Sequence, residues 1–218
     1  ESAYGEYSRA LARRDSLICY SVKANSNLAI LCLLARLGAG FDIVSGGELA
    51  RVLAAGGDPR KTVFSGIGKS VAEIEFALAT EILCINVESE AELERVDAVA
   101  RKGGRRAPIA FRVNPDIDAR THPYISTGLR ENKFGVAFDH AERLYRRAAG
   151  MAGIEVVGIG CHVGSQLTRS SPYVEAAARL VALADRLAAE GIRLRHLDFG
   201  GGIGIRYQDE APEPISSF

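Results

Sequence analysis

The sequence carries no excess of either charge. Its 218 residues include 27 Lys and Arg and 27 Asp and Glu, so the formal net charge at pH 7 is zero. Nucleic acids and anionic membrane surfaces attract strongly basic chains, so we expect neither as a partner.

Cysteine is sparse and unpaired in its spacing. The four residues, each standing singly in an apolar run, are Cys19, Cys32, Cys84 and Cys161. None forms a CxxC pair or has metal-ligand spacing around it, so no metal site is predicted. No apolar stretch is long enough to cross a bilayer, and no signal peptide is recognisable. Free thiols are typical of a reducing compartment, so we expect a cytoplasmic protein.

Lysine is also scarce. Five of the 27 basic residues are lysines: Lys23, Lys61, Lys69, Lys102 and Lys133. Lys23 directly follows the apolar run 17–22, at the end of a predicted strand. A desolvated lysine can form a Schiff base with a carbonyl, whereas an arginine cannot, so Lys23 is a candidate for amine chemistry. The alternative is an ordinary solvated lysine at a strand end.

Short apolar runs alternate with amphipathic helix patterns. Strands are predicted at 17–22, 40–45, 62–65, 82–87, 108–113, 154–163 and 196–199. Helices are predicted at 27–37, 46–56, 70–79, 89–102, 139–150 and 172–190, and residues 4–14 match the tail of another helix. This alternation predicts an α/β protein with a parallel sheet. About seven β/α units favour an incomplete (β/α)8 barrel of the TIM type, with a doubly wound sheet as the alternative.

Both ends of the chain suggest a fragment. The chain does not begin with Met, and residues 211–218 resemble an interrupted segment. We therefore expect one barrel domain, residues 1–218, truncated at both ends. Residues 114–138 carry few helix signals, and connections this long are usually functional.

Polar residues gather where the predicted strands end, which is where (β/α) barrels carry their reactive groups. These positions hold Lys23, Asp42, Ser45, Ser65, Arg112, Asn114, His162, Ser165 and Gly200–Gly202. If His162 points into the barrel, Gly158 and Gly160 beneath it do so too. They then leave space for a flat ligand, unless they only ease the packing of strand on helix.

A glycine-rich turn, Gly200-Gly201-Gly202-Ile203-Gly204, ends the last predicted strand. Backbone N–H groups without a neighbouring Cβ can surround a phosphate, although such a turn alone is weak evidence. A metal at Cys161 and His162 is not predicted, because adjacent strand residues point to opposite faces. A phosphate cradle, a Schiff-base lysine and a pocket for a flat ring together indicate pyridoxal 5'-phosphate (PLP).

Several motifs resemble the PLP-dependent decarboxylases of the alanine racemase-like barrel family. Tyr20-Ser21-Val22-Lys23-Ala24-Asn25 is similar to their PLP-lysine motif. His162-Val163-Gly164-Ser165-Gln166 and Gly200-Gly201-Gly202 resemble their ring-stacking and phosphate motifs. The run from His122 to Gly135 resembles the diaminopimelate decarboxylases within that family, and the similarity covers nearly the whole chain.

The resemblance implies a role for each candidate. Lys23 would form the Schiff base and His162 would stack on the pyridine ring, as the two catalytic residues. The implied cofactor-binding residues are Lys23, Asp42, Arg112, His162, Ser165, Gly200, Gly201 and Gly202. The implied reaction is decarboxylation of meso-2,6-diaminopimelate to L-lysine and CO2, the last step of lysine biosynthesis. A homodimer acting on a small amino acid is implied as well.

Two parts of the family pattern are missing. One is a Glu-Pro-Gly-Arg segment whose Glu pairs the pyridinium nitrogen; Glu213-Pro214 lies too close to the glycines and lacks Gly-Arg. The other is the C-terminal β-domain, with its cysteine motif and substrate-binding tyrosine. We therefore predict that these 218 residues alone release no CO2. Three alternatives stay open: a decarboxylase of ornithine, lysine or arginine, a non-catalytic PLP-binding or regulatory relative, and a non-PLP barrel in which Lys23 is only a cation.

Overall fold

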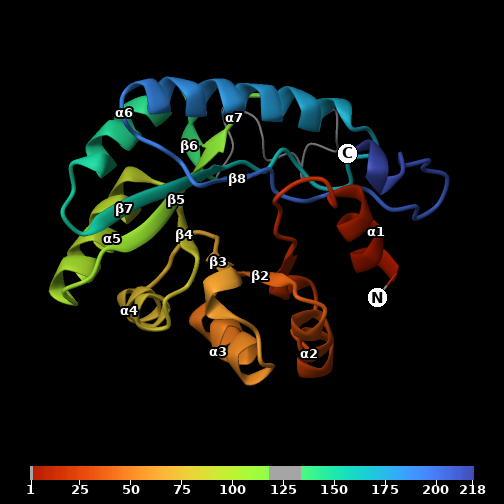
Figure 1. Ribbon diagram of the computed structural model, residues 1–218, viewed down its shortest axis with the longest axis horizontal. Coiled ribbons are helices and arrows are strands. Elements are labelled where there is room, and N and C mark those ends of the chain that lie inside the picture. Colours follow the sequence, from red (N-terminus) through yellow and green to blue (C-terminus); the bar gives the residue numbers. More distant parts are fainter. Residues whose placement is uncertain (1, 118–133) are drawn as a thin grey trace. The chain divides into compact units, whose positions relative to one another are not determined.

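Figure 1 shows the computed structural model, which describes residues 2–117 and 134–218. The chain forms two units. The first consists of Glu1–Asn86, Ala91–Ile109 and Ala152–Glu155, and the second of Val87–Glu90, Ala110–Met151 and Val156–Phe218. Strand β5 (Ala107–Asn114) contributes residues to both.

Strands and helices alternate in the first unit. The strands β1 (Cys19–Ser21), β2 (Gly40–Ile43), β3 (Thr62–Phe64) and β4 (Cys84–Val87) pair in sequence order, all parallel. The helices are α1 (Ser2–Ala10), α2 (Leu28–Arg36), α3 (Gly46–Ala54), α4 (Val71–Ala79) and α5 (Glu90–Lys102), with 3-10 turns η1 (Val22–Ala24) and η2 (Pro59–Lys61). Parallel neighbours need such crossover connections, so the helix after each strand returns the chain to the starting edge of the sheet.

Polar side chains set where three of these helices begin. The Asn27 side chain accepts from the Ala29 N–H at 2.9 Å, and the Ser45 hydroxyl accepts from the Glu48 N–H at 3.2 Å. Ser70 forms a capping box with Glu73 at the start of α4. Each cap satisfies a backbone donor that the first helical turn leaves open.

The core of the first unit lies between its strands and helices. Fully buried aliphatic side chains on α2 to α5 include Leu31, Leu49, Ile74 and Leu93. Burying one such side chain contributes about 1.5–3 kcal/mol to folding. Phe41 and Ile43 on β2 are also fully buried. Because side chains alternate along a strand, Asp42 between them lies on the opposite face of the sheet.

The second unit continues the parallel pattern. Strand β7 (Ile154–Gly160) pairs with β8 (His196–Asp198), and the two-residue strand β6 (Val136–Ala137) pairs with β5. Helices α6 (Phe138–Ala149) and α7 (Ser171–Ala189) lie on one side of β7 and β8 (Figure 1), and η3 (Ile215–Ser217) is the last element. The buried Tyr145 hydroxyl donates to the Gly158 carbonyl at 2.8 Å, which ties α6 to β7.

Each predicted strand and helix is present, with several bounds shifted by a few residues; α1, for example, ends at Ala10 rather than at residue 14. Three further differences concern the predicted site and the sheet. Strand β1 ends at Ser21, so Lys23 lies in the turn η1 rather than next to a strand residue. Strand β7 ends at Gly160, before His162. Strand β6 was not predicted, because two residues carry no readable pattern. Most of the run 122–135 lies outside the described residues.

Two kinds of feature are absent from the described part of the chain. None of its helices has both the length and the apolar character to cross a bilayer. It likewise contains no group of three or more His, Cys, Asp or Glu side chains arranged to hold a metal ion.

Candidate active site

Lys23 lies in the turn between β1 and α2, in the first unit. Its neighbour Val22 is fully buried, whereas Lys23 is exposed. The following residues have structural tasks: the Asn25 side chain accepts from the Asn27 N–H at 3.0 Å, and Asn27 caps α2. The Lys23 amine has no hydrogen-bond or ion-pair partner among residues 2–117 and 134–218. Within the described part of the chain, the Lys23 amine therefore takes no part in holding the fold together.

Asp42 lies close to that turn. It is in register with Ser21 across β1 and β2, and the Ser21 hydroxyl donates to Asp42 Oδ2 at 3.1 Å. The turn η1 packs against β2. Two of the predicted site residues, Lys23 and Asp42, are thus brought together at the carboxyl ends of neighbouring strands.

Ser65 and Asn86 form a second polar pair in this unit. The buried Asn86 donates from Nδ2 to Ser65 Oγ at 3.0 Å, and the Cys84 thiol contacts Asn86 Oδ1 at 3.3 Å. Asn86 was missed in the sequence. An asparagine inside the apolar run 82–87 was the signal that could have revealed it, because a buried amide needs hydrogen-bond partners.

Lys69 and Glu92 form a buried ion pair in the first unit. Lys69 is 2% exposed, and its ammonium donates to Glu92 Oε1 at 2.8 Å, to the Asn86 carbonyl at 2.8 Å and to the Gly66 carbonyl at 2.5 Å. All three N–H bonds of the ammonium therefore have acceptors. Neither Lys69 nor Glu92 was predicted to be special.

Arg112 belongs to the second unit, on β5. Its Nη1 lies 3.5 Å from Glu88 Oε1, and its guanidinium lies 5.2 Å from the centre of the Phe134 ring. The Glu88 side chain is almost completely buried. Glu88 was another omission from the sequence prediction, although a carboxylate directly after an apolar strand is the same kind of signal as Lys23.

His162 meets the glycine turn of the second unit. The Gly201 N–H points at His162 Nδ1 at 3.5 Å, a long contact. Gly200 has a φ of +73°, and a Cβ there would lie 2.9 Å from His162 Nδ1 and 2.6 Å from the Cys161 carbonyl. Only glycine suits such a position, because both the backbone conformation and the neighbouring atoms exclude a side chain.

Ser165 lies beside the same turn. A Cβ at Gly202, whose φ is +91°, would approach the Ser165 Cα to 3.1 Å and would collide with the Gly164 carbonyl at 1.9 Å. Gly201 differs, since a Cβ there would meet nothing within 4 Å. Close packing thus explains Gly200 and Gly202, while the space in front of Gly201 is open to a ligand.

The glycines beneath His162 have another role than predicted. A Cβ at Gly158 would lie 2.2 Å from His196 Nε2, and a Cβ at Gly160 would lie 3.2 Å from the Asp198 Cβ. The expected space for a flat ligand at Gly158 is therefore wrong, because the imidazole of the neighbouring strand β8 fills it. Burial lowers the pKa of His196, with a smaller contribution from Arg195, and thus favours a neutral ring.

Cys161 is a poor metal ligand. Burial, with a smaller contribution from Asp198, raises the pKa of its thiol to about 12. Metals bind the thiolate, so this shift opposes metal binding at neutral pH.

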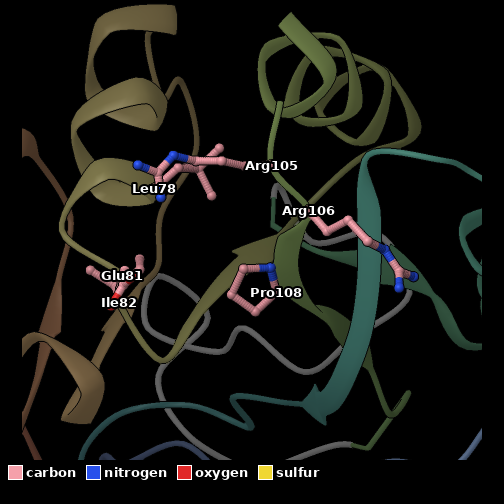
Figure 2. Close-up of a pocket in the computed structure, with 6 residues that line it drawn as sticks. All are labelled: Leu78, Glu81, Ile82, Arg105, Arg106 and Pro108. Carbon is pink, nitrogen blue, oxygen red and sulfur yellow. The ribbon is translucent and has the colours of Figure 1, made fainter. Parts of the chain in front are cut away.

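A pocket in the first unit lies away from these residues. It has a volume of about 270 Å³ and is lined by Leu78, Glu81, Ile82, Arg105, Arg106 and Pro108 (Figure 2). Ile82 precedes β4 and Arg105 precedes β5, so the pocket is at the amino ends of strands, whereas Lys23 and Asp42 are at carboxyl ends. Arg106 points away from the pocket and donates to the Ile154 carbonyl at 2.7 Å. This pocket contains none of the predicted site residues.

Comparison with known proteins identifies the family. Residues 1–217 match the family described as pyridoxal-dependent decarboxylase, pyridoxal binding domain. The chain belongs to this family. It is 59% identical over 212 residues to the diaminopimelate decarboxylase of Pseudomonas aeruginosa, which covers 97% of this chain and 51% of that protein. The chain thus spans about half the length of the relatives it matches.

Solved structures agree with the family match. The crystal structure of diaminopimelate decarboxylase from Helicobacter pylori complexed with L-lysine is similar with a TM-score of 0.96 and 49% identity, over 99% of this chain and 55% of that chain. The lysine/ornithine decarboxylase of Vibrio vulnificus complexed with putrescine has a TM-score of 0.82 and 25% identity, over 99% and 53% of the two chains. These likenesses confirm the predicted barrel-type α/β fold of a PLP-dependent decarboxylase.

The described residues fit the family's cofactor. Considering residues 2–117 and 134–218, the Lys23 amine is exposed and has no partner, as attachment of an aldehyde requires, and the space at Gly201 is open, as phosphate binding requires. Lys23 and Asp42 lie in the first unit, and Arg112, His162, Ser165 and the three glycines lie in the second.

Proposed function

We propose that this chain is the PLP-binding part of an enzyme that decarboxylates meso-2,6-diaminopimelate to L-lysine and CO2. The observation that carries the proposal is the match to the pyridoxal binding domain over residues 1–217, with an exposed lysine at the position of the PLP-lysine motif. PLP supplies an electron sink for the charge that develops at the substrate Cα when CO2 leaves.

The proposed residue roles follow from the chemistry of each group. Lys23 holds the cofactor through its amine, and Asp42 lies close enough to line the same pocket. His162 packs against the cofactor ring and is oriented by its contact with Gly201. Ser165 and the glycine turn supply hydroxyl and N–H donors to the phosphate.

Arg112 has a separate proposed role as a positive charge lining the cofactor pocket. Its contact with the buried Glu88 carboxylate and its place over Phe134 restrict its rotamers. A guanidinium fixed in this way costs little reorganisation when an anionic group approaches, which is the advantage of a preorganised site.

The preference for diaminopimelate rests on the difference in identity. The chain is 59% identical to a diaminopimelate decarboxylase and 25% identical to a lysine/ornithine decarboxylase over similar lengths. The second candidate, decarboxylation of lysine, ornithine or arginine, is supported only by the shared fold and cofactor. The family relationship supports a homodimer, and the four free cysteines suit a cytoplasmic enzyme.

The test uses the complete product of the gene that encodes this chain. CO2 release is measured with meso-diaminopimelate, L-lysine, L-ornithine, L-arginine and no amino acid. We expect turnover of meso-diaminopimelate alone, and a preference for another of these amino acids would reject the substrate assignment. PLP binding without turnover of any of them would favour a non-catalytic relative. The 218-residue chain by itself is expected to bind PLP without releasing CO2.

A further inference from the structure

Tyr173 contacts the glycine turn from another element. It lies in the first turn of α7, and its hydroxyl donates to the Gly201 carbonyl. Its ring packs edge-on against Phe218, with 5.4 Å between ring centres and an angle of 89°. The contact with Phe218 restrains the Tyr173 side chain, and the hydrogen bond from its hydroxyl restrains the Gly201 carbonyl.

That carbonyl shares a peptide group with the Gly202 N–H. The peptide bond is planar, and no cis peptide occurs in the described chain, so the carbonyl and the N–H point in opposite directions. Fixing the Gly201 carbonyl on Tyr173 therefore fixes the direction of the Gly202 N–H. Among residues 2–117 and 134–218 this N–H has no acceptor, whereas the Gly202 carbonyl accepts from the Leu167 N–H at 2.8 Å.

The peptide group between two glycines is easily reoriented. Glycine populates both signs of φ, so neither Gly201 nor Gly202 resists rotation of the group between them by steric means. The flanks of the turn are held elsewhere: the Gly200 N–H donates to Asp198 Oδ1 at 2.8 Å, and the Ile205 N–H donates to Gln166 Oε1 at 3.1 Å. The Gly201–Gly202 peptide lies between these anchors, and Tyr173 restrains it.

We propose that Tyr173 is a positioning residue for phosphate binding. By holding the Gly201 carbonyl, its hydroxyl keeps the Gly202 N–H directed away from Tyr173, as a donor for the phosphate of the cofactor. The inference rests on the proposed function, because it requires the glycine turn to receive that phosphate.

The test compares two probes that differ only in the phosphate. Dissociation constants of PLP and of pyridoxal, which lacks the phosphate, are measured for the complete protein and its Tyr173→Phe variant. The variant keeps the ring contact with Phe218 and removes the hydroxyl. We expect PLP binding to weaken about fivefold, the effect of losing one hydrogen bond of ordinary strength, with pyridoxal binding unchanged. Tyr207→Phe, which removes a hydroxyl from a 72% exposed side chain, is the matched control and should change neither constant.

A second readout needs no cofactor. Inorganic phosphate should raise the melting temperature of the apo protein, and this shift should be smaller in Tyr173→Phe than in Tyr207→Phe. Equal weakening of PLP and pyridoxal binding would indicate a general structural role and overturn the proposal, as would unchanged PLP binding. If the unaltered protein bound PLP no better than pyridoxal, the phosphate role of the glycine turn would fail first, and the Tyr173 proposal with it.

Discussion

Two lysines of the first unit follow strands of the same parallel sheet but differ in exposure and in hydrogen bonding. Lys23 comes two residues after β1 and is exposed, without a hydrogen-bond or ion-pair partner in the described part of the chain. Lys69 comes five residues after β3 and is 2% exposed, with its ammonium bonded to Glu92 and two carbonyls.

The difference shows what makes a lysine available for covalent chemistry. A nucleophilic amine must lose a proton and approach a carbonyl. Lys69 could do so only by giving up three hydrogen bonds, one of which is part of its ion pair with Glu92. Lys23 gives up no such contact with residues 2–117 or 134–218. Position at the end of a strand is therefore not sufficient, and the local bonding of the amine decides which lysine serves the cofactor.

The largest expected effect is that of Lys23→Ala. We expect this variant to fold and to lose completely the visible absorption that PLP gains when it attaches to a lysine. Absorption spectra after PLP addition, with the melting temperature as a check on folding, provide the measurement. Persistence of that absorption in Lys23→Ala would assign the attachment to another lysine. It would contradict the conclusion that the exposed Lys23 is the lysine that binds the cofactor.

In contrast to Lys23→Ala, Lys69→Met should destabilise the fold and leave PLP attachment intact. Removing the ammonium breaks the buried ion pair with Glu92, and breaking such a pair from one side costs about 3–5 kcal/mol of folding free energy. Urea unfolding measures the loss. The folded fraction should still attach PLP through Lys23, so an attachment defect beyond the unfolded fraction would show that Lys69 also serves the cofactor.

The double variant Lys69→Met, Glu92→Leu separates charge burial from packing. An apolar pair of similar volume removes the buried carboxylate together with the ammonium, so we expect most of the stability lost in Lys69→Met to return. The Gly66 and Asn86 carbonyls still lose a donor, which keeps recovery incomplete. If the double variant were as unstable as Lys69→Met, the ion pair would not be the source of the effect.

The smallest expected effects are at the N-caps of the helices that follow the two lysines in the chain, Asn27 for α2 and Ser70 for α4. Asn27→Ala and Ser70→Ala should each lower the free energy of unfolding by about 1 kcal/mol.

The two caps should differ in their dependence on pH. Hydrogen bonds from the Gly46 N–H and from Ser70 lower the pKa of Glu73. Their stabilisation is therefore present above the unfolded pKa of Glu73 and is lost as pH falls through the folded value. Ser70→Ala should therefore cost less in acid than at neutral pH. The cost of Asn27→Ala should not change with pH, because its cap involves no carboxylate.

The alternation of apolar runs and amphipathic helices was enough to predict the α-helices and the strands other than the two-residue β6. Buried parallel strands such as Cys84–Val87 stand out as apolar runs. The helix caps were not predicted: Ser45 stood among the predicted site residues, and Ser70 was the first residue of a predicted helix. The end of β1 was less readable, because Val22 is as buried as a strand residue although it belongs to a 3-10 turn. Burial and backbone conformation are separate properties there, and a hydrophobic pattern reports only burial.

The residues that the sequence did not reveal depend on contacts between distant segments. Glu92 looks like a surface residue of a charged helix until Lys69, 23 residues earlier, lies against it. Gly158 looks like space for a ligand until His196 of the next strand occupies it. Conversely, Gly200 and Gly202 were predicted as a cradle, and their close approach to Cys161, His162 and Gly164 gives a packing reason for the same glycines.

The Lys69 cluster also bears on the order of folding. Its acceptors lie 3, 17 and 23 residues from Lys69 along the chain, so the contacts close short loops within consecutive β/α units. Contacts of low sequence separation cost little chain entropy and favour rapid folding. We expect the segment from β3 to α5 to be structured in the transition state, so that Lys69→Met slows refolding more than it speeds unfolding.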